Sequence, residues 1–480
     1  MSDLGKKTIS GVLWSGIERL LVQGLQFILG IVLARLLLPS DYGLIGMLTI
    51  FFSISLAIVD SGFSQALIQR KIVTQTDYST VFYFNLLTSL CIYAGLYFAS
   101  PYIAAFFEEP RLTLITRVIS LSILFNALSI IQIAKLTKAL DFKSQTKCSV
   151  IAIVVSGILG IYLAFLGYGV WALVIQMVLK SILNLLLLIV FAWWWPSLVF
   201  SKKSLKSLFS FGSKLLASGL LNAVFNNLYY VVIGKFFSTK ELGLYTRANQ
   251  FQLLPSETLA VILQRVTLPV LSGIQDDKER LVHYYRKFIR FTALVTFPLM
   301  LGLAVLATPL ISVVLTDTWI ESVPYLRLLA LVGLLYPIHA LNLNLLKVLG
   351  RTDLFLRLEI YKKIAIVITL LATFRYGMLA LIAGQVLLSF LFLYINTYYT
   401  GKLVGYGLSQ QLKDIYPYLF FAIFMGGLVL LFESIFLSPH YTLLLGTLIG
   451  VVVYSVLIFS FKRSEFDEII KIVTSKLRSR

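Results

Sequence analysis

The sequence predicts an all-α integral membrane protein with about fourteen transmembrane helices. The chain has 480 residues, of which 59% are hydrophobic and only 13% are charged. A soluble domain carries about 25% charged residues, so little of this chain can face water. The apolar residues form continuous blocks, and a helix needs about 20 such residues to cross a bilayer. Blocks of this kind exclude a transmembrane barrel, whose strands alternate in hydrophobicity over ~10 residues.

Turn signals separate the apolar blocks and locate each span. They lie at residues 38–43 (LPSDYG), 109–110 (EP), 167–169 (GYG) and 438–439 (SP). The predicted spans cover residues 12–35, 43–66, 79–107, 112–134, 148–167, 170–192, 208–237, 243–270, 288–314, 323–346, 359–375, 377–398, 415–436 and 441–461. The first block contains Glu18 and Arg19 and lacks a small-residue cleavage site. It is therefore predicted to remain as a span, not to be cleaved as a signal peptide.

The distribution of basic residues predicts the orientation of the spans. Lys and Arg outnumber Asp and Glu by 41 to 22. If the N-terminus is cytoplasmic, most of these cations fall in the inner loops, Lys362 and Lys363 among them. The outer loops then hold only Arg35, Arg111, Lys235, Lys240 and Arg375. This bias is the positive-inside signal, and an even number of spans puts both termini in the cytoplasm. The net charge of +19 therefore indicates membrane topology and not nucleic-acid binding.

The sequence also repeats itself, which predicts two related halves. Residues 34–35 and 40–44 recur as residues 234–235 and 240–244, at a constant offset of 200. Residues 167–173 (GYGVWAL) recur as residues 375–381 (RYGMLAL), although short matches can also arise by chance. We expect two pseudo-repeated six-helix bundles around a central cavity, a common transporter plan with alternating access. The predicted parts are residues 1–200, residues 201–400, two appended spans in residues 401–461, and a cytoplasmic tail in residues 462–480. The tail has the pattern of an amphipathic helix on the inner leaflet, and a solvated tail is the alternative.

The sequence contains none of the common catalytic or cofactor motifs. It has no P-loop, dinucleotide-binding glycine pattern, metal spacing or nucleophile elbow. Cys91 and Cys148 lie in or beside apolar segments and are interpreted as small core residues. No catalytic residue, cofactor or bound metal is expected, while coupling to H⁺ or Na⁺ is left open.

Polar residues inside spans are the candidate site, because an ionisable group in hydrocarbon costs about 2.5–3.5 kcal/mol or more. The predicted substrate-binding residues are Arg19, Gln23 and Gln26 on span 1, Lys214, Asn222 and Asn226 on span 7, and Arg247, Gln250 and Glu257 on span 8. Cations dominate this set, which suits an anionic substrate, and arginine offers a planar fork for phosphate oxygens. Two alternatives stay open: Arg19 pairs with Glu18 or Glu257 to hold the bundle, and Arg117, Lys180 and Arg327 extend to an interface.

Three segments carry a resemblance to a known family. Residues 34–43 (ARLLLPSDYG), 60–68 (DSGFSQALI) and 243–250 (GLYTRANQ), followed by Pro255, resemble Wzx-type polysaccharide exporters. These oligosaccharide flippases belong to the multidrug/oligosaccharidyl-lipid/polysaccharide superfamily and are related to lipid II flippases. The resemblance covers nearly the whole chain in length, span number and repeat.

The resemblance implies a function and several site residues. It implies that an undecaprenyl-pyrophosphate-linked oligosaccharide moves from the inner to the outer leaflet of the bacterial cytoplasmic membrane. Arg19 matches a cavity arginine of the lipid II flippases, whereas their span 8 arginine falls nearer Gln250 than Arg247. In those relatives spans 13 and 14 extend a groove for the lipid tail, and here they could equally be packing helices. A polysaccharide polymerase and a chain-length regulator are the protein partners that this function implies.

Two other functions are weighed against the flippase. A multidrug/cation antiporter of the same superfamily would rely on buried carboxylates, which the cation-rich spans and the fourteen-helix count disfavour. A polysaccharide polymerase or ligase would need acceptor chemistry on a sizeable outer loop, but each predicted outer loop has about ten residues or fewer.

Overall fold

The computed structural model describes residues 21–433 and 438–461, and every regular element there is a helix. Eleven of these helices are long and apolar enough to cross a membrane. The other three predicted spans correspond to Leu21–Leu36, α10 (Thr239–Ser272) and α14 (Thr352–Thr373). The last two carry several charged residues, which lowers their hydropathy. The all-α architecture with about fourteen spans is confirmed.

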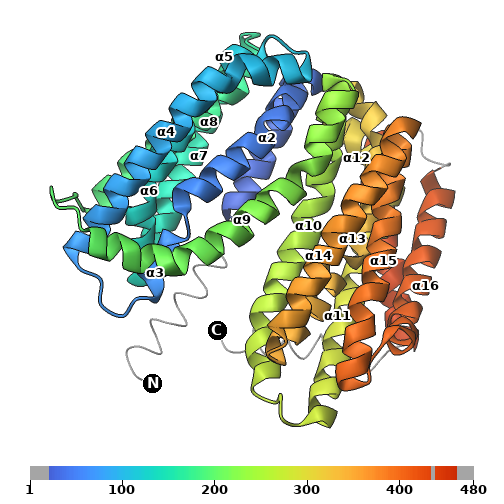
Figure 1. Cartoon of the computed structure of the whole chain (residues 1–480). Coiled ribbons are helices and arrows are strands. Elements are labelled where there is room, and N and C mark those ends of the chain that lie inside the picture. The colour runs from blue at the N-terminus through green and yellow to red at the C-terminus, as the bar shows by residue number, and fades with distance from the viewer. Residues whose placement is uncertain (1–20, 434–437, 462–480) are drawn as a thin grey trace. The chain divides into compact units, whose positions relative to one another are not determined.

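The first compact unit comprises, among the described residues, 21–243. After Leu21–Leu36 it contains α2 (Pro39–Asp60), α3 (Phe63–Gln69), α4 (Gln75–Phe107), α5 (Leu112–Ile119), α6 (Leu121–Lys138), α7 (Phe142–Phe165), α8 (Val170–Ala192), α9 (Lys202–Phe236) and the first residues of α10. Within it α7 packs along α8, α2 along α9, and α4 along α6 (Figure 1). These helices are long because their apolar stretches run unbroken between turn residues.

The second compact unit comprises, among the described residues, 244–433 and 438–461. Its elements are the rest of α10, α11 (Lys278–Val305), α12 (Ala307–Val314), η1 (Asp317–Ser322), α13 (Val323–Val348), α14, η2 (Phe374–Tyr376), α15 (Met378–Val404), α16 (Leu408–Glu433) and α17 (Pro439–Phe461). Here α11 packs against both α13 and α16, and α17 packs on α16. The appended helices α16 and α17 therefore share the apolar core of this unit. The division of the sequence at residues 200 and 400 stays a prediction.

The turn predicted at residues 38–43 is shorter than expected, which corrects the sequence analysis. α2 already begins at Pro39, which occupies the first turn of the helix, where a missing N–H costs nothing. The Asp41 carboxylate accepts a hydrogen bond from the Leu38 backbone N–H at 3.1 Å. Residues that favour turns thus serve here as a helix start, because proline and aspartate stabilise the first helical turn as well.

The two copies of the repeat contact each other through glycine within the first unit. A Cβ added to Gly43 of α2 would lie 1.8 Å from the carbonyl oxygen of Thr239 at the start of α10. A Cβ added to Gly243 would lie 1.7 Å from the carbonyl oxygen of Pro39. Positions 43 and 243, and positions 39 and 239, are related by the 200-residue offset. The repeat therefore produces a reciprocal backbone contact that only glycine permits.

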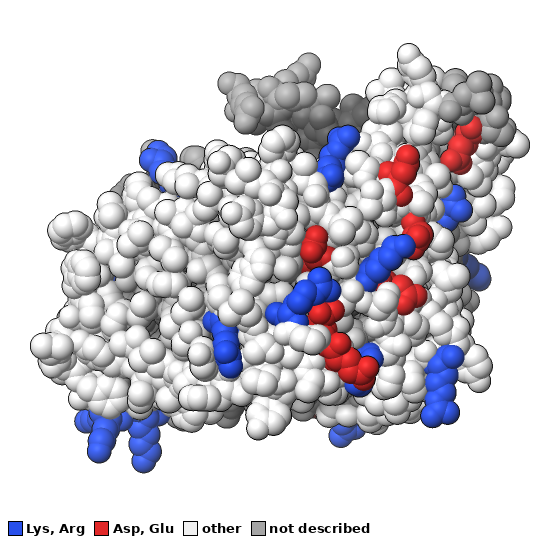
Figure 2. Space-filling model, turned by 90° about the horizontal axis from the view of Figure 1, so that it is seen from above, with Lys and Arg blue, Asp and Glu red and all other residues white. Residues whose placement is uncertain are grey.

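The surface agrees with a lipid environment. Figure 2 shows that uncharged side chains form most of the displayed face and that charged ones gather in a few places. Large apolar side chains are exposed on many helices, among them Phe98, Phe165 and Leu387. Contiguous apolar exposure on this scale is a membrane surface, since soluble monomers rarely expose it.

Candidate functional site

In the first unit, the predicted site residues lie on two helices. Gln23 and Gln26 are half-buried, three residues apart on one face of Leu21–Leu36. Asn222 and Asn226 are exposed, one turn apart on α9. Lys214 belongs to α9, but its side chain lies outside the described part, and Arg19 lies outside the described residues.

In the second unit, the predicted residues lie on α10. Arg247 is only 5% exposed, and its Nη1 donates a hydrogen bond to Oε1 of Gln250 at 2.6 Å. Glu257 is partly buried further along the same helix. The guanidinium of Arg247 therefore reaches the side chain at position 250, where the resemblance puts the family's arginine. The one-turn departure in sequence is small in space, because a long side chain spans one helical turn.

Two of the three additional cations have polar neighbours close to the ends of their helices. The Arg117 Nε donates to the Ser100 Oγ at 3.0 Å, and the guanidinium carbon lies 4.3 Å from the Tyr97 ring centre. The Arg327 Nη2 donates to the Thr308 Oγ1 at 3.0 Å. Both arrangements fit the interface alternative. Lys180 is different, since it lies near the middle of α8 and is half-buried.

Two of the five cations of the predicted outer loops pair with a nearby carboxylate. Lys235 Nζ lies 2.8 Å from Glu108 Oε1, and Arg111 Nε lies 2.8 Å from Glu109 Oε1. The hydrogen bond from Lys235 lowers the pKa of the Glu108 carboxyl, and the bond from Arg111 lowers that of Glu109. The positive-inside rule counts Lys and Arg and not net charge, so the orientation of the spans stays a prediction.

An ion pair with a buried lysine lies inside the second unit. Lys362 was counted with the inner-loop cations although the predicted span 359–375 includes it; it lies within α14 and is 7% exposed. Its Nζ lies 3.4 Å from Oε1 of Glu359, one turn earlier. The predicted span starts at residue 359, whereas α14 begins at Thr352, because the five charged residues between positions 353 and 363 resemble a loop in sequence. The available signal was the spacing of Glu359 and Lys362, three residues apart.

A second buried network joins α16 to α11. Asp414 accepts hydrogen bonds from Arg286 Nε at 2.8 Å and Nη2 at 3.0 Å, and from Arg290 Nη2 at 2.6 Å. The Tyr406 hydroxyl donates to the same carboxylate at 2.7 Å. The cations are half-exposed while Asp414 is buried. One carboxylate thus attaches the first appended helix to the bundle.

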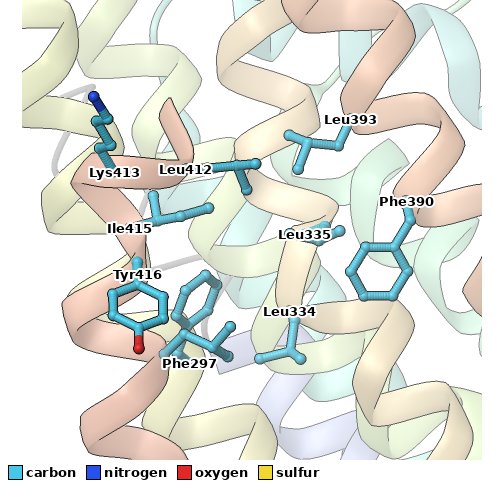
Figure 3. A pocket seen from close by; sticks show the side chains of 10 residues that line it. Phe297, Leu334, Leu335, Phe390, Leu393, Leu412, Lys413, Ile415 and Tyr416 are labelled. Carbon is cyan, nitrogen blue, oxygen red and sulfur yellow. The ribbon is translucent and has the colours of Figure 1, made fainter. Parts of the chain in front are cut away.

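Beside this network lies an apolar groove of about 500 Å³ within the second unit. Phe297 of α11 and Leu334 of α13 line it, together with Leu393 of α15 and Ile415 of α16 (Figure 3). The Lys413 side chain lies at one end of the groove. An apolar channel with a cation at its end suits a hydrocarbon chain attached to an anionic head group. α16 therefore both packs on the bundle and forms a wall of this groove.

Helices of this length and apolarity, with buried cations on some of them, define a polytopic membrane protein of transporter type. Residues 32–324 match the family described as "Polysaccharide biosynthesis protein". The match covers more than half of the chain, so the protein belongs to this family.

Curated relatives are similar over most of their length. The chain is 28% identical over 356 residues to the "Teichuronic acid biosynthesis protein TuaB" of Bacillus subtilis, covering 74% of each chain. It is 26% identical to the "Succinoglycan biosynthesis transport protein ExoT" of Rhizobium meliloti, covering 95% of this chain and 94% of the relative. It is 25% identical to the "Lipopolysaccharide biosynthesis protein WzxC" of Escherichia coli, covering 75% and 74%.

Solved structures show the same fold. An inward closed conformation of "Lipid II flippase MurJ" matches with a TM-score of 0.78 and 19% identity, covering 94% of this chain and 99% of that one. An inward-facing multidrug resistance MATE family transporter of the MOP superfamily matches with a TM-score of 0.59 and 16% identity, covering 82% and 98%. The fold of the multidrug/oligosaccharidyl-lipid/polysaccharide superfamily, expected from the resemblance, is therefore confirmed.

Proposed function

We propose that this protein is a flippase that moves an undecaprenyl-pyrophosphate-linked oligosaccharide from the inner to the outer leaflet of the bacterial cytoplasmic membrane. The product supplies surface polysaccharide synthesis. Transport proceeds by alternating access, and the protein is a transporter and not an enzyme. The observation that carries this proposal is membership in the polysaccharide biosynthesis family on a fourteen-span fold shared with a lipid II flippase.

The chemistry of the candidate residues supports an anionic, sugar-bearing substrate. We assign the pyrophosphate to Arg19, Lys214 and Arg247, because charge-assisted hydrogen bonds to phosphate are about twice as strong as neutral ones. The amide side chains of Gln23, Gln26, Asn222, Asn226 and Gln250 can donate to and accept from sugar hydroxyls, and Glu257 can accept from them. The polyprenyl tail stays in the bilayer, with the groove beside α16 available to one of its segments.

The proposal includes a cellular setting. Both termini face the cytoplasm, as the placement of basic residues predicts. The substrate and membrane lipid are the direct partners, and a polymerase with its chain-length regulator acts on the flipped product. Nucleic acid is not a partner.

The test is deletion of the gene, followed by analysis of surface polysaccharide and of undecaprenyl-linked intermediates. We expect loss of the polymer and accumulation of complete lipid-linked units that a membrane-impermeant periplasmic glycosidase cannot reach. Units that are accessible but not polymerised would identify a polymerase instead. Normal polymer together with increased drug sensitivity would identify the antiporter function of the superfamily. The MATE transporter resembles this fold less than the lipid II flippase does, which favours the first outcome.

A further inference from the structure

An ionisable cluster lies inside the second unit, on three neighbouring helices. α14 contributes the buried Lys362 and its partner Glu359, α13 contributes His339, and α15 contributes Ser389 and Phe392. The Lys362 Nζ lies 5.8 Å from the centre of the Phe392 ring. The His339 ring contacts the same phenyl group edge-on, at 6.4 Å between ring centres. The lysine and the histidine thus share one aromatic neighbour.

The two ring nitrogens of His339 differ in their hydrogen bonding. Nε2 lies 3.2 Å from the Ser389 Oγ. Nδ1 is buried and has no hydrogen-bond partner among the described residues. A neutral imidazole carries one N–H donor and one bare acceptor nitrogen. When Nε2–H donates to Ser389, the lone pair of Nδ1 is the atom that can take up a proton.

The cluster lies deep within the spans. His339 precedes the end of α13 by nine residues, and Lys362 follows the start of α14 by ten. At 1.5 Å of rise per residue, both lie about 14–15 Å from their helix ends. That depth is near the middle of a ~30 Å hydrocarbon layer. Ionisable side chains at such a depth are costly to bury and mark ion or proton pathways in transporters.

Among the charged groups of the surrounding helices, Lys362 contacts the Phe392 ring that His339 also contacts, and Glu359 pairs with Lys362. α14 also carries the exposed Arg357 and the partly buried Lys363. On α11, Arg286 and Arg290 are bound to Asp414. The charged residue of α15, Lys402, is exposed near the end of that helix. α10 contributes Arg265, which is exposed, and the partly buried Glu257. On α13 itself, Arg327 binds Thr308 and Lys347 is exposed.

The charges of this cluster limit how many protons it can hold. A protonated His339 would put a second positive charge beside Lys362, with Glu359 as the available counter-charge. Because both side chains contact the Phe392 ring, an imidazolium at His339 and the Lys362 ammonium would be neighbouring like charges, so proton uptake by His339 opposes the charged state of Lys362. A metal cation is disfavoured for the same reason, because a resident ammonium already pairs with the carboxylate.

We propose that His339, Lys362 and Glu359 form a proton-binding site, at which His339 Nδ1 takes up and releases H⁺ and thereby couples a proton gradient to transport. The coupling part rests on the flippase function proposed above, whereas proton binding by the cluster does not. The step makes and breaks one N–H bond, with water as the proton source and sink on either side of the membrane.

Proton binding can be measured without transport. The chain has three histidines, of which His283 and His440 are exposed, so ¹⁵N-histidine NMR of the purified protein resolves His339 with His339→Gln as the assignment control. We expect Lys362→Met to raise the proton affinity of His339 at least about tenfold, one pH unit in its titration midpoint. Lys362→Arg keeps the charge and should restore the wild-type midpoint. A His339 signal that does not titrate, or that Lys362→Met leaves unchanged, overturns the site.

Coupling is then measured in proteoliposomes that contain lipid-linked oligosaccharide. A transmembrane pH gradient should change the wild-type flipping rate several-fold, and His339→Gln should reduce the ratio of rates with and without the gradient to one. His283→Gln, on the exposed face of α11, should keep the wild-type ratio. Gradient-independent flipping by the wild type, or a normal ratio in His339→Gln, contradicts coupling. Absence of wild-type flipping alongside the expected NMR titration contradicts the proposed function and supports the proton site.

Discussion

Arg286 of α11 donates two hydrogen bonds to the carboxylate of Asp414 of α16, although the two residues are 128 positions apart in sequence. Arg290 and Tyr406 bind the same carboxylate. The carboxylate is buried while both guanidinium groups reach water. The two guanidinium groups neutralise the buried carboxylate through hydrogen bonds. Because both cations stay half-exposed, only the carboxylate bears the full cost of burial.

Asp414→Ala should therefore loosen the appended helices. We expect a loss of about 2 kcal/mol in stability, since the change removes charged hydrogen bonds and the exposed cations limit the cost. The measurement is thermal unfolding in detergent, with tryptophan fluorescence as the probe. Asp353→Ala is the control, because Asp353 pairs with Arg351 on an exposed surface, and its unfolding midpoint should stay near the wild-type value. Equal losses in both variants would contradict the structural role of Asp414.

The glycine contact makes a prediction about folding. Gly43→Ala and Gly243→Ala should each reduce the yield of folded, monodisperse protein sharply, because the new methyl group would meet a backbone carbonyl at under 2 Å. Size-exclusion chromatography of detergent-extracted protein measures this yield. Gly95→Ala in α4 is the control, since nothing lies within 4 Å of its Cβ position. It should keep the yield and can gain about 0.5–1 kcal/mol of helix stability. A normal yield for Gly43→Ala would show that the two helices can separate there without cost.

Arg247 is expected to be the most sensitive described residue of the candidate site. Arg247→Ala should reduce surface polysaccharide by about tenfold or more, the effect of losing one charged hydrogen bond to phosphate. Arg247→Lys should give an amount of surface polysaccharide between those of the wild type and Arg247→Ala, because lysine keeps the charge and loses the planar fork. Quantitative glycan blots at matched membrane expression provide the measurement. Arg265→Ala, an exposed position on the same helix, is the control. Wild-type polymer levels in Arg247→Ala would remove Arg247 from the site.

The groove provides a test of where the lipid tail lies. Leu393→Trp narrows the apolar groove of about 500 Å³ and should slow flipping in proteoliposomes while the protein stays folded, at a cost of about 1–3 kcal/mol for overpacking. Leu387→Trp, on an exposed part of α15, should leave the rate unchanged. If both variants flip at the wild-type rate, the tail does not use this groove.

The sequence by itself determined the membrane class, the approximate position of each span and the family. These depend on local properties, namely the length of apolar runs, turn residues and short motifs such as residues 34–43. It also determined the polar pair on α10, because Arg247 and Gln250 are one turn apart and meet on any helix. It placed the start of α14 seven residues too late and counted the buried Lys362 with the loop cations, because the local charge density resembles a loop.

Only the tertiary structure decided which distant residues meet. Asp414 pairs with Arg286, and Gly43 lies against Thr239, because their helices pack together. Helical spacing within one segment cannot predict either contact. The same holds for His339, an isolated histidine in sequence, which lies beside a lysine and a serine of two other helices. In a helical membrane protein the backbone hydrogen bonds are satisfied within each helix, so local sequence is enough to form the helices. Their partners are chosen by side-chain packing and buried charge pairs, which are properties of the assembled bundle.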